Sequence, residues 1–292
     1  MIKHNLVLLT VTLVTVSCSY VDALFDWNGK FALVTGGAQG NGYAIISELL
    51  QLGVGGVSLV DIHVRKGRRS AQTLNERYGT DRVIFVPANI SHADQLESAF
   101  KVSIWHWNGL DIVINNAGVS NEDNWNLMIK VNVKATVHAT FLGFEYMSKS
   151  KGGKGGVIIN ISSTFGINPE FYQPVYDATK SFILGLNRAL GNEIYYDYNE
   201  IRIITVCPGA TDTQFFHNFG NSASNSLSPF VKQLAINAMQ AEEAQSTDNV
   251  AKGVISIIEE GDNGSVWVVE DNEEPYELDF PDIQSMQKEN YS

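Results

Sequence analysis

The chain has 292 residues, 44% hydrophobic and 18% charged, and this composition and length suit one large globular α/β domain. Its formal net charge of −12 repels phosphate backbones, so we expect no nucleic-acid partner. The six histidines include no His-Glu-x-x-His motif and the two cysteines lie far apart, so no metal site is expected.

Residues 1–23 resemble a targeting segment. Lys3 and His4 precede an apolar run over 6–16, which small residues follow up to Ala23. The run is short for a membrane span but fits the core of a signal peptide; the alternative is a strand of the domain. We therefore expect a secreted or secretory-pathway protein without a stable membrane span, or alternatively a cytoplasmic or ER-associated one. The sequon at Asn160 ends an expected buried strand, so either it is skipped or the domain never enters the lumen.

Strand-length apolar runs alternate with helix-length stretches over residues 24–270. The expected strands are 31–35, 57–61, 83–86, 112–115, 157–161, 203–207 and 266–269. The expected helices are 43–52, 66–78, 93–107, 125–147, 174–195 and 248–259. This alternation predicts right-handed crossovers between parallel strands, hence a single Rossmann-type, doubly wound α/β domain of about seven strands flanked by helices. Ser91 and Asp94 form an expected capping box for the third helix.

Two segments interrupt the alternation. Residues 210–244 are too long for a plain connection, and such an insertion after the sixth strand lies where substrates bind in these sheets. It is interpreted either as a substrate lid or as a helical hairpin that packs its aromatic residues into the core. The large apolar residues of this segment are the aromatic Phe215, Phe216, Phe219 and Phe230, together with Leu227. The acidic tail, 271–292, is expected to be solvated.

A glycine-rich turn joins the first strand to the first helix. Gly36, Gly40 and Gly42 lack Cβ atoms, so the backbone there can approach a pyrophosphate bound at the helix N-terminus. A turn with no ligand is the alternative. Asp61 favours a cofactor, because it ends the second strand where a carboxylate can bind both ribose hydroxyls. That carboxylate would repel a 2′-phosphate, so NAD is expected rather than NADP.

Candidate catalytic residues come from the second half of the sheet. Tyr176 and Lys180 are four residues apart, so they share one helix face. Tyr-x-x-x-Lys alone is common by chance, but Ser163 follows a buried strand and its hydroxyl can meet a ligand at the sheet edge. Asn116 closes the fourth strand, and Asn132 lies in mid-helix, where an amide is otherwise a poor choice.

Together these motifs resemble the short-chain dehydrogenase/reductase family, over about residues 27–213. Segments 118–125 and 155–160 are similar to an NAD-dependent branch of the family that acts on hydroxylated lipids. Two positions depart from the family pattern, Asn41 where Ile is usual and Asn89 where Asp is usual. The residues that carry the resemblance are Thr35, Gly36, Gly40, Gly42, Asn115 to Gly118, Asn132, Ser163, Tyr176, Lys180, Pro208 and Gly209.

The resemblance implies a role for each matching residue. Tyr176 would take the alcohol proton, Lys180 would lower its pKa and hold a ribose, and Ser163 would bind the reacting oxygen. Asn132 would hold a water linked to Lys180. Substrate contacts are expected from Ser163 and Gln173. The expected NAD-binding residues are Gly36, Gly40, Asn41, Gly42, Asp61, Asn89, Ile90, Asn116, Tyr176, Lys180 and Thr213.

The leading hypothesis is an NAD-dependent dehydrogenase for a secondary alcohol of a lipid-like substrate. A carbonyl reductase working in the reverse direction is one alternative, and a secreted carrier with little turnover is another. Intact Ser163, Tyr176 and Lys180 argue against the carrier. The resemblance also implies a homodimer or homotetramer built on helices 125–147 and 174–195.

Overall fold

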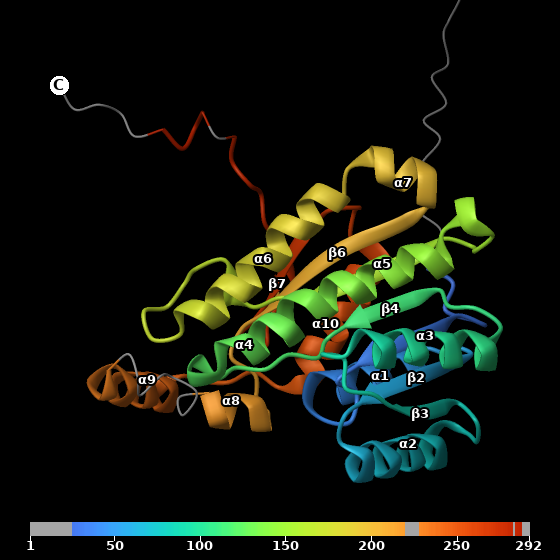
Figure 1. Cartoon of the computed structure of the whole chain (residues 1–292), viewed down its shortest axis with the longest axis horizontal. Helices are drawn as coiled ribbons and strands as arrows, with labels where there is room; N and C mark the ends of the chain where they lie inside the picture. The colour runs from blue at the N-terminus through green and yellow to red at the C-terminus, as the bar shows by residue number, and fades with distance from the viewer. Residues whose placement is uncertain (1–24, 220–227, 283, 288–292) are drawn as a thin grey trace, which may run out of the picture.

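A computed structural model describes residues 25–219, 228–282 and 284–287 of the chain (Figure 1). The signal-like segment lies outside the described residues. Within the described ranges, no helix is both long enough and apolar enough to cross a membrane.

An eight-stranded sheet forms the centre of the domain, in the order β3-β2-β1-β4-β5-β6-β7-β8. The first seven strands in the chain pair in parallel, and β8 pairs antiparallel with β7. The doubly wound sheet is therefore confirmed. The strands are β1 Phe31–Thr35, β2 Gly56–Asp61, β3 Val83–Pro87, β4 Ile112–Asn115, β5 Gly156–Ile161, β6 Ile201–Pro208, β7 Val266–Val269 and β8 Tyr276–Glu277.

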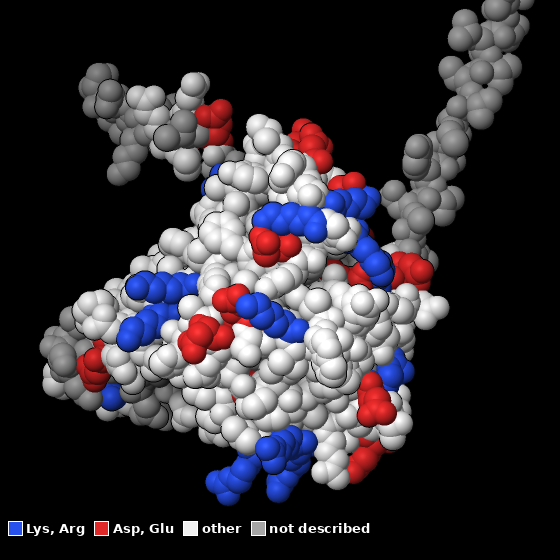
Figure 2. Space-filling view, turned by 45° about the vertical axis from the view of Figure 1, so that its right-hand side comes forward, with Lys and Arg blue, Asp and Glu red and all other residues white. Residues whose placement is uncertain are grey.

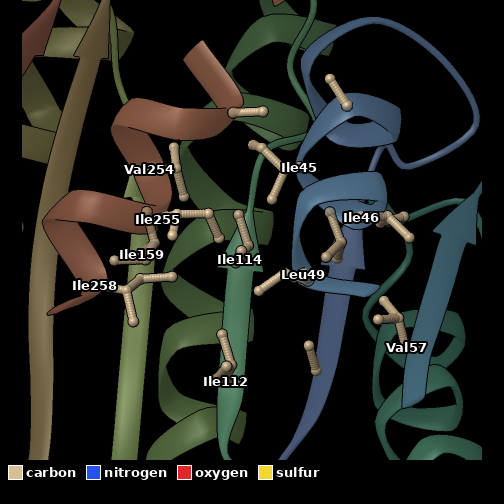
Figure 3. Close-up of a cluster of buried hydrophobic side chains, with 14 of the residues drawn as sticks. Ile45, Ile46, Leu49, Val57, Ile112, Ile114, Ile159, Val254, Ile255 and Ile258 are labelled. Atoms are coloured by element: carbon tan, nitrogen blue, oxygen red, sulfur yellow. The ribbon is translucent and has the colours of Figure 1, made fainter. Parts of the chain in front are cut away.

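Helices cover both faces of this sheet (Figure 1). Helices α1, α2 and α10 pack on one face, while α3, α5 and α6 pack on the other. Figure 3 shows the first layer, where Ile45 and Leu49 of α1 and Val254 of α10 meet Ile114 of β4 and Ile159 of β5. The α-helices are α1 Gly40–Gln51, α2 Val64–Tyr78, α3 Ala93–Trp107, α4 Trp125–Met128, α5 Thr136–Met147, α6 Pro174–Leu190, α7 Glu193–Asn199, α8 Gln214–Phe219, α9 Pro229–Ala241 and α10 Thr247–Glu260.

Two long expected helices are interrupted. The stretch 125–147 contains a π-helical segment, Ile129–Ala135, between α4 and α5. The stretch 174–195 divides because α6 ends at Leu190 and the Asn192 side chain accepts a hydrogen bond from the Ile194 amide at the start of α7. An asparagine N-cap starts a new helix rather than continuing the old one.

The expected capping box at the start of α3 is wrong. His92 is the N-cap of this helix and makes no side-chain capping bond. The Ser91 hydroxyl instead donates to the Asn89 side chain at 2.8 Å, within the turn that follows β3. A short Asn–Ser pair therefore forms a local turn in preference to a cap.

The sequence predicted a solvated acidic tail, but part of the tail packs against the domain. After β8 extends the sheet, Leu278 and Phe280 pack against the cluster around Leu184 and Cys207. The Arg188 guanidinium lies 4.0 Å from the centre of the Phe280 ring. The many acidic residues around Leu278 and Phe280 favoured the prediction of a solvated tail. In addition, a strand of two residues is too short to show a periodic hydrophobic pattern.

Acidic and basic side chains are interspersed over the molecular face in Figure 2, where the basic ones form separate small groups.

The strand order of the sheet indicates where a ligand would bind. β1 pairs with β2 on one side and with β4 on the other, so the strand order reverses between β1 and β4. In doubly wound sheets, ligands bind outside the carboxyl ends of the strands at this reversal.

Candidate active site

A cavity of about 420 Å³ opens at the carboxyl ends of the strands. It is lined by the loops that follow each of the seven parallel strands, β1 to β7, and by α8 and the end of α9. Three expected site residues, Gly42, Asn132 and Gln173, do not line it. The expected residues that do are Gly36, Gly40, Asn41, Asp61, Asn89, Ile90, Asn116, Ser163, Tyr176, Lys180 and Thr213.

The glycine turn packs tightly against the loop after β4. A Cβ atom on Gly42 would lie 2.4 Å from the Gly36 carbonyl oxygen and 2.6 Å from the Asn116 side-chain nitrogen. Gly36 has a φ of +68°, which other residues rarely adopt. Asn116 Nδ2 donates to the Thr35 and Gly36 carbonyls at 2.9 and 3.3 Å. Asn116 therefore holds the turn in shape, and Gly42 acts from behind the cavity wall.

Asp61 stands at the end of β2, nearly buried, with both carboxylate oxygens oriented by backbone amides. Ala38 N donates to Oδ2 at 3.1 Å and His63 N donates to Oδ1 at 2.8 Å. Asn41 contributes a second acceptor, because its buried Oδ1 has no hydrogen-bond partner among the residues that the structure describes. A glycine turn at a helix N-terminus, an oriented carboxylate and a spare buried acceptor fit a dinucleotide carrying ribose hydroxyls.

Tyr176, Ser163 and Lys180 meet at the opposite wall. Tyr176 and Lys180 lie one turn apart on α6, and the Lys180 nitrogen is 5.7 Å from the centre of the Tyr176 ring. The Ser163 side chain, at the loop after β5, hydrogen-bonds to that of Tyr176. Lys180 Nζ also donates to the Ile161 carbonyl at 3.0 Å, which fixes its position beneath the phenol.

Burial dominates the acid–base properties of this group. It raises the pKa of Tyr176 well above its usual value, although the hydrogen bond with Ser163 opposes the shift. Burial also lowers the pKa of Lys180 to about 8, so the ammonium is the main form at neutral pH. A phenol in this setting needs nearby positive charge to ionise, and Lys180 supplies one.

Asn132 acts one layer below the cavity. Its Oδ1 accepts from Val119 N at 2.9 Å, and its Nδ2 donates to the Val119 carbonyl and to Thr179 Oγ1. It lies in the π-helical segment between α4 and α5, and such bulges are frequent at functional sites. Asn132 thus connects the loop after β4 to the residue preceding Lys180.

Sequence reasoning missed Glu122, a buried carboxylate beside the expected tyrosine. It accepts from Tyr176 N at 2.8 Å and from Val175 N at 3.2 Å, and so caps α6 from 54 positions away in the chain. The N-cap residue itself, Gln173, makes no side-chain capping bond. The only sequence signal was its place in the short segment after Gly118, because a cap this remote has no fixed spacing.

Gln173 is not brought to the cavity, so the structure lends no support to its expected contact with substrate. The side chain is fully buried, and its Oε1 accepts from the Ser120 hydroxyl at 2.7 Å. Thr213 does line the cavity, where its hydroxyl accepts from Phe216 N at 3.1 Å and so begins α8.

Within the segment 210–244, the described residues form α8 and α9, which lie beside α4 at one end of the sheet (Figure 1). Phe215 and Phe216 line the cavity, and the Phe215 ring centre is 5.9 Å from that of Tyr176. Phe230 is 70% exposed and therefore belongs neither to the cavity nor to the core. Leu227 lies outside the described residues. The lid interpretation thus fits α8, whereas α9 contributes Met239 and packs Ala235 inward.

Asp177, next to Tyr176, yields a prediction about stability. Burial, with the nearby Glu122 and Glu170 carboxylates, raises its pKa to about 7. An unfolded aspartate ionises near pH 4, so this group lowers stability progressively from about pH 4 to about pH 7 and fully above it. We expect Asp177→Asn to raise the free energy of unfolding by about 1–3 kcal/mol at about pH 8 and to change it little at about pH 4. Urea unfolding at both pH values measures this; equal effects at the two would contradict it.

The arrangement has the parts for moving a proton and a hydride at one carbon. A phenol and a hydroxyl share a hydrogen bond at the cavity wall, an ammonium lies beneath the phenol, and a site fit for a dinucleotide opens into the same cavity. A phenol supported by a lysine can act as a general acid or base toward an alcohol or carbonyl oxygen.

Comparisons with known proteins agree with this geometry. A family model described as short chain dehydrogenase matches residues 30–223. The 15-hydroxyprostaglandin dehydrogenase [NAD(+)] of Mus musculus is 35% identical over 243 residues, covering 83% of this chain and 90% of its own. The Homo sapiens protein of that name is 39% identical over 186 residues, 64% of this chain and 70% of its own.

Among solved structures, a short chain dehydrogenase/reductase from Burkholderia phymatum in complex with NAD superposes with a TM-score of 0.69 at 20% identity. The match covers 80% of this chain and 87% of that one, and at this identity it shows the shared fold alone. The family model, by contrast, spans about two thirds of the chain and includes the glycine turn, Ser163, Tyr176 and Lys180. The chain therefore belongs to the short-chain dehydrogenase family.

Proposed function

We propose that this chain is an NAD-dependent dehydrogenase that oxidises a secondary alcohol of a lipid-like molecule, such as a hydroxy fatty acid, a prostanoid or a steroid. The observation that carries the proposal is the meeting of Ser163, Tyr176 and Lys180 in the same cavity as the glycine turn and Asp61. Relatives named as NAD-dependent 15-hydroxyprostaglandin dehydrogenases support both the cofactor and the class of reaction. Apolar lining from Phe165, Phe215 and Met239 supports a hydrocarbon substrate.

NAD would be held along the cavity from Asp61 to Tyr176. The Asp61 carboxylate would accept hydrogen bonds from ribose hydroxyls, and the turn at Gly36 and Gly40 would accommodate the pyrophosphate. Asn41 Oδ1 and Thr213 also line the cavity, and they would form hydrogen bonds with polar groups of NAD other than the ribose hydroxyls and the pyrophosphate. When bound, the oxidised nicotinamide would bring a positive charge to the site and would supply the acceptor for the hydride.

The protein's own groups would manage the proton. The Ser163 hydroxyl would bind the alcohol oxygen and set its position, while the Tyr176 oxygen would take its proton. Lys180, held at the Ile161 carbonyl, would stabilise the resulting negative charge on the phenol. In the reverse direction the same phenol would protonate a ketone oxygen, so a carbonyl reductase would need no different residue.

An activity screen tests the proposal. Purified protein would be given secondary alcohols with NAD or NADP, and the corresponding ketones with the reduced cofactors, with nicotinamide absorbance as the readout. We expect turnover of apolar secondary alcohols with NAD. Binding of NADH without turnover of any alcohol or ketone would favour a carrier, and absence of NADH binding would refute the proposed cofactor site.

Cofactor choice gives a second prediction. Asp61→Asn removes the negative charge. Its one oxygen can still accept from His63 N, which keeps the loop after β2 in shape, whereas Ala38 N loses its acceptor. We expect the KM for NAD to rise about tenfold and the preference for NAD over NADP to shrink, because a charged acceptor binds ribose hydroxyls more strongly than a neutral one. Steady-state kinetics with both cofactors measures this; an unchanged ratio would remove Asp61 from the ribose site.

The location of the enzyme bears on Asn160. Its side chain is fully buried, and Nδ2 donates to Asn187 Oδ1 at 2.8 Å and to Thr140 Oγ1 at 3.2 Å. A glycan attached to that nitrogen would be incompatible with these contacts. We propose that Asn160 is unmodified, either because the sequon is skipped or because the domain stays outside the lumen.

A further inference from the structure

We propose that the substrate is an uncharged secondary alcohol and that carboxylates around the cavity select against lipids that carry a free acid. The inference rests on the proposed function and narrows its substrate class: it keeps steroids and esterified hydroxy lipids and disfavours hydroxy fatty acids and prostanoids whose acid group is free. It follows from the charges along the cavity wall, from the position of Glu242, and from the apolar lining beside the phenol.

The substrate end of the cavity is apolar. Val119, Leu127, Phe165, Phe215 and Met239 line it around Tyr176. Such a wall favours a hydrocarbon chain or ring system, because burying apolar surface is the dominant source of binding for such groups. A hydrocarbon with one hydroxyl for Ser163 and Tyr176 would satisfy the described wall.

Charged groups at the cavity are mostly negative. Among the described residues that line it, Lys180 is the only lysine or arginine, and its nitrogen is already bonded to the Ile161 carbonyl. In addition, the sequence has no lysine or arginine from Ala210 to Val231. A substrate carboxylate would therefore find no lysine or arginine other than Lys180 in the described wall, and the lining histidine, His63, lies beside Asp61 at the ribose end. The carboxylates that line the cavity are Asp61, Glu242, Glu270 and Asp271.

Of these four carboxylates, Glu242 is the one that adjoins the apolar lining in the chain. It follows α9 directly, in the same stretch as Met239, whereas Asp61 lies at the opposite, ribose end. Its charge, with that of Glu170, adds to the burial that raises the pKa of Tyr172, a residue packed in the cluster around Tyr176 and Met128. Glu242 therefore lines the cavity close in the chain to Met239, which belongs to its apolar wall.

An acidic substrate would experience this charge as repulsion. Two like charges several ångströms apart near a protein surface repel enough to weaken binding about tenfold, and salt screens the effect because Glu242 is exposed. An ester or an alcohol without the acid group would bind through the apolar wall alone. The cavity should therefore distinguish two substrates that differ only in a carboxylate.

The test compares a fatty acid carrying a mid-chain secondary hydroxyl with its methyl ester. For the native chain with NAD, we expect kcat/KM to be about tenfold higher for the ester, with the difference shrinking as salt is raised. Glu242→Gln should narrow the ratio by improving the acid alone, and Glu242→Lys should narrow it further or reverse it. The matched control is Glu243→Gln, an exposed neighbour that does not line the cavity and should leave the ratio unchanged.

Competition with NADH fluorescence measures the binding of both compounds independently of turnover. Equal or stronger use of the acid by the native chain, or a ratio that both Glu242 variants leave unchanged, would overturn the charge selection. Preferential binding of the ester without turnover of either compound would support the charge selection and contradict the proposed dehydrogenase activity.

Discussion

Replacing Tyr176 with phenylalanine is expected to lower kcat by about 10²–10⁴-fold while changing the affinity for NADH less than about twofold. The variant keeps the ring that packs near Phe215 and beneath which Lys180 lies, and loses only the hydroxyl that hydrogen-bonds to Ser163. Without that oxygen no group in the described wall can take the alcohol proton at the same place. Initial rates and NADH fluorescence titrations measure the two quantities separately.

Tyr172→Phe is the matched control, because it removes a phenol of equally high burial from the same cluster without touching the cavity wall. It should retain most of the turnover. Full activity in Tyr176→Phe, or an equal loss in both variants, would remove the acid–base role from Tyr176 and leave it a packing residue.

Glu122→Ala should destabilise the fold by about 2–4 kcal/mol and also lower kcat by about tenfold. The change leaves two backbone amides, the half-buried Val175 N and the buried Tyr176 N, without their acceptors. Pro174 has no amide proton and the Gln173 side chain does not cap, so nothing nearby replaces the carboxylate. The first turn of α6 would loosen, and with it the position of the phenol. Urea unfolding and steady-state kinetics measure the two effects.

Two further variants separate positioning from simple loss of charge. Asp123→Asn makes the same charge change at an exposed neighbour and should alter neither quantity appreciably. Glu122→Gln keeps one oxygen acceptor and should fall between the native chain and the alanine variant, with a larger effect on kcat than on the KM for NAD. If Glu122→Ala unfolds more easily yet the folded enzyme keeps its kcat, the carboxylate stabilises the helix but does not position Tyr176.

Much of the fold could be predicted because its signals are local. Each of the first seven strands is an apolar run ending near a turn, and the strand bounds differ from the prediction by at most two residues at either end. The glycine turn and the Tyr-x-x-x-Lys spacing place Gly36 and Tyr176 by rules of backbone and helix geometry. Membership of the family, the doubly wound sheet and NAD as cofactor were therefore within reach of the sequence.

The rest depended on contacts that have no sequence spacing. Glu122 caps a helix 54 positions away, and Asn132 is fixed through Val119 and Thr179 from a π-helical segment that the periodicity cannot distinguish from an α-helix. Gln173 aligned with an expected substrate contact, but its side chain bonds to Ser120 behind the wall. Short sequence motifs therefore predict the residues expected to contact the cofactor. They do not predict the residues, such as Glu122 and Asn132, that hold those residues in position.

The proposed function requires the phenol, the lysine and the glycine turn to contact one bound dinucleotide. A crystal structure of the protein with NADH tests it most directly. We expect the ribose at Asp61, the pyrophosphate at the turn from Gly36 to Gly40, and the nicotinamide ring beside the Tyr176 hydroxyl. A cofactor bound elsewhere, or a nicotinamide ring remote from that hydroxyl, would contradict it.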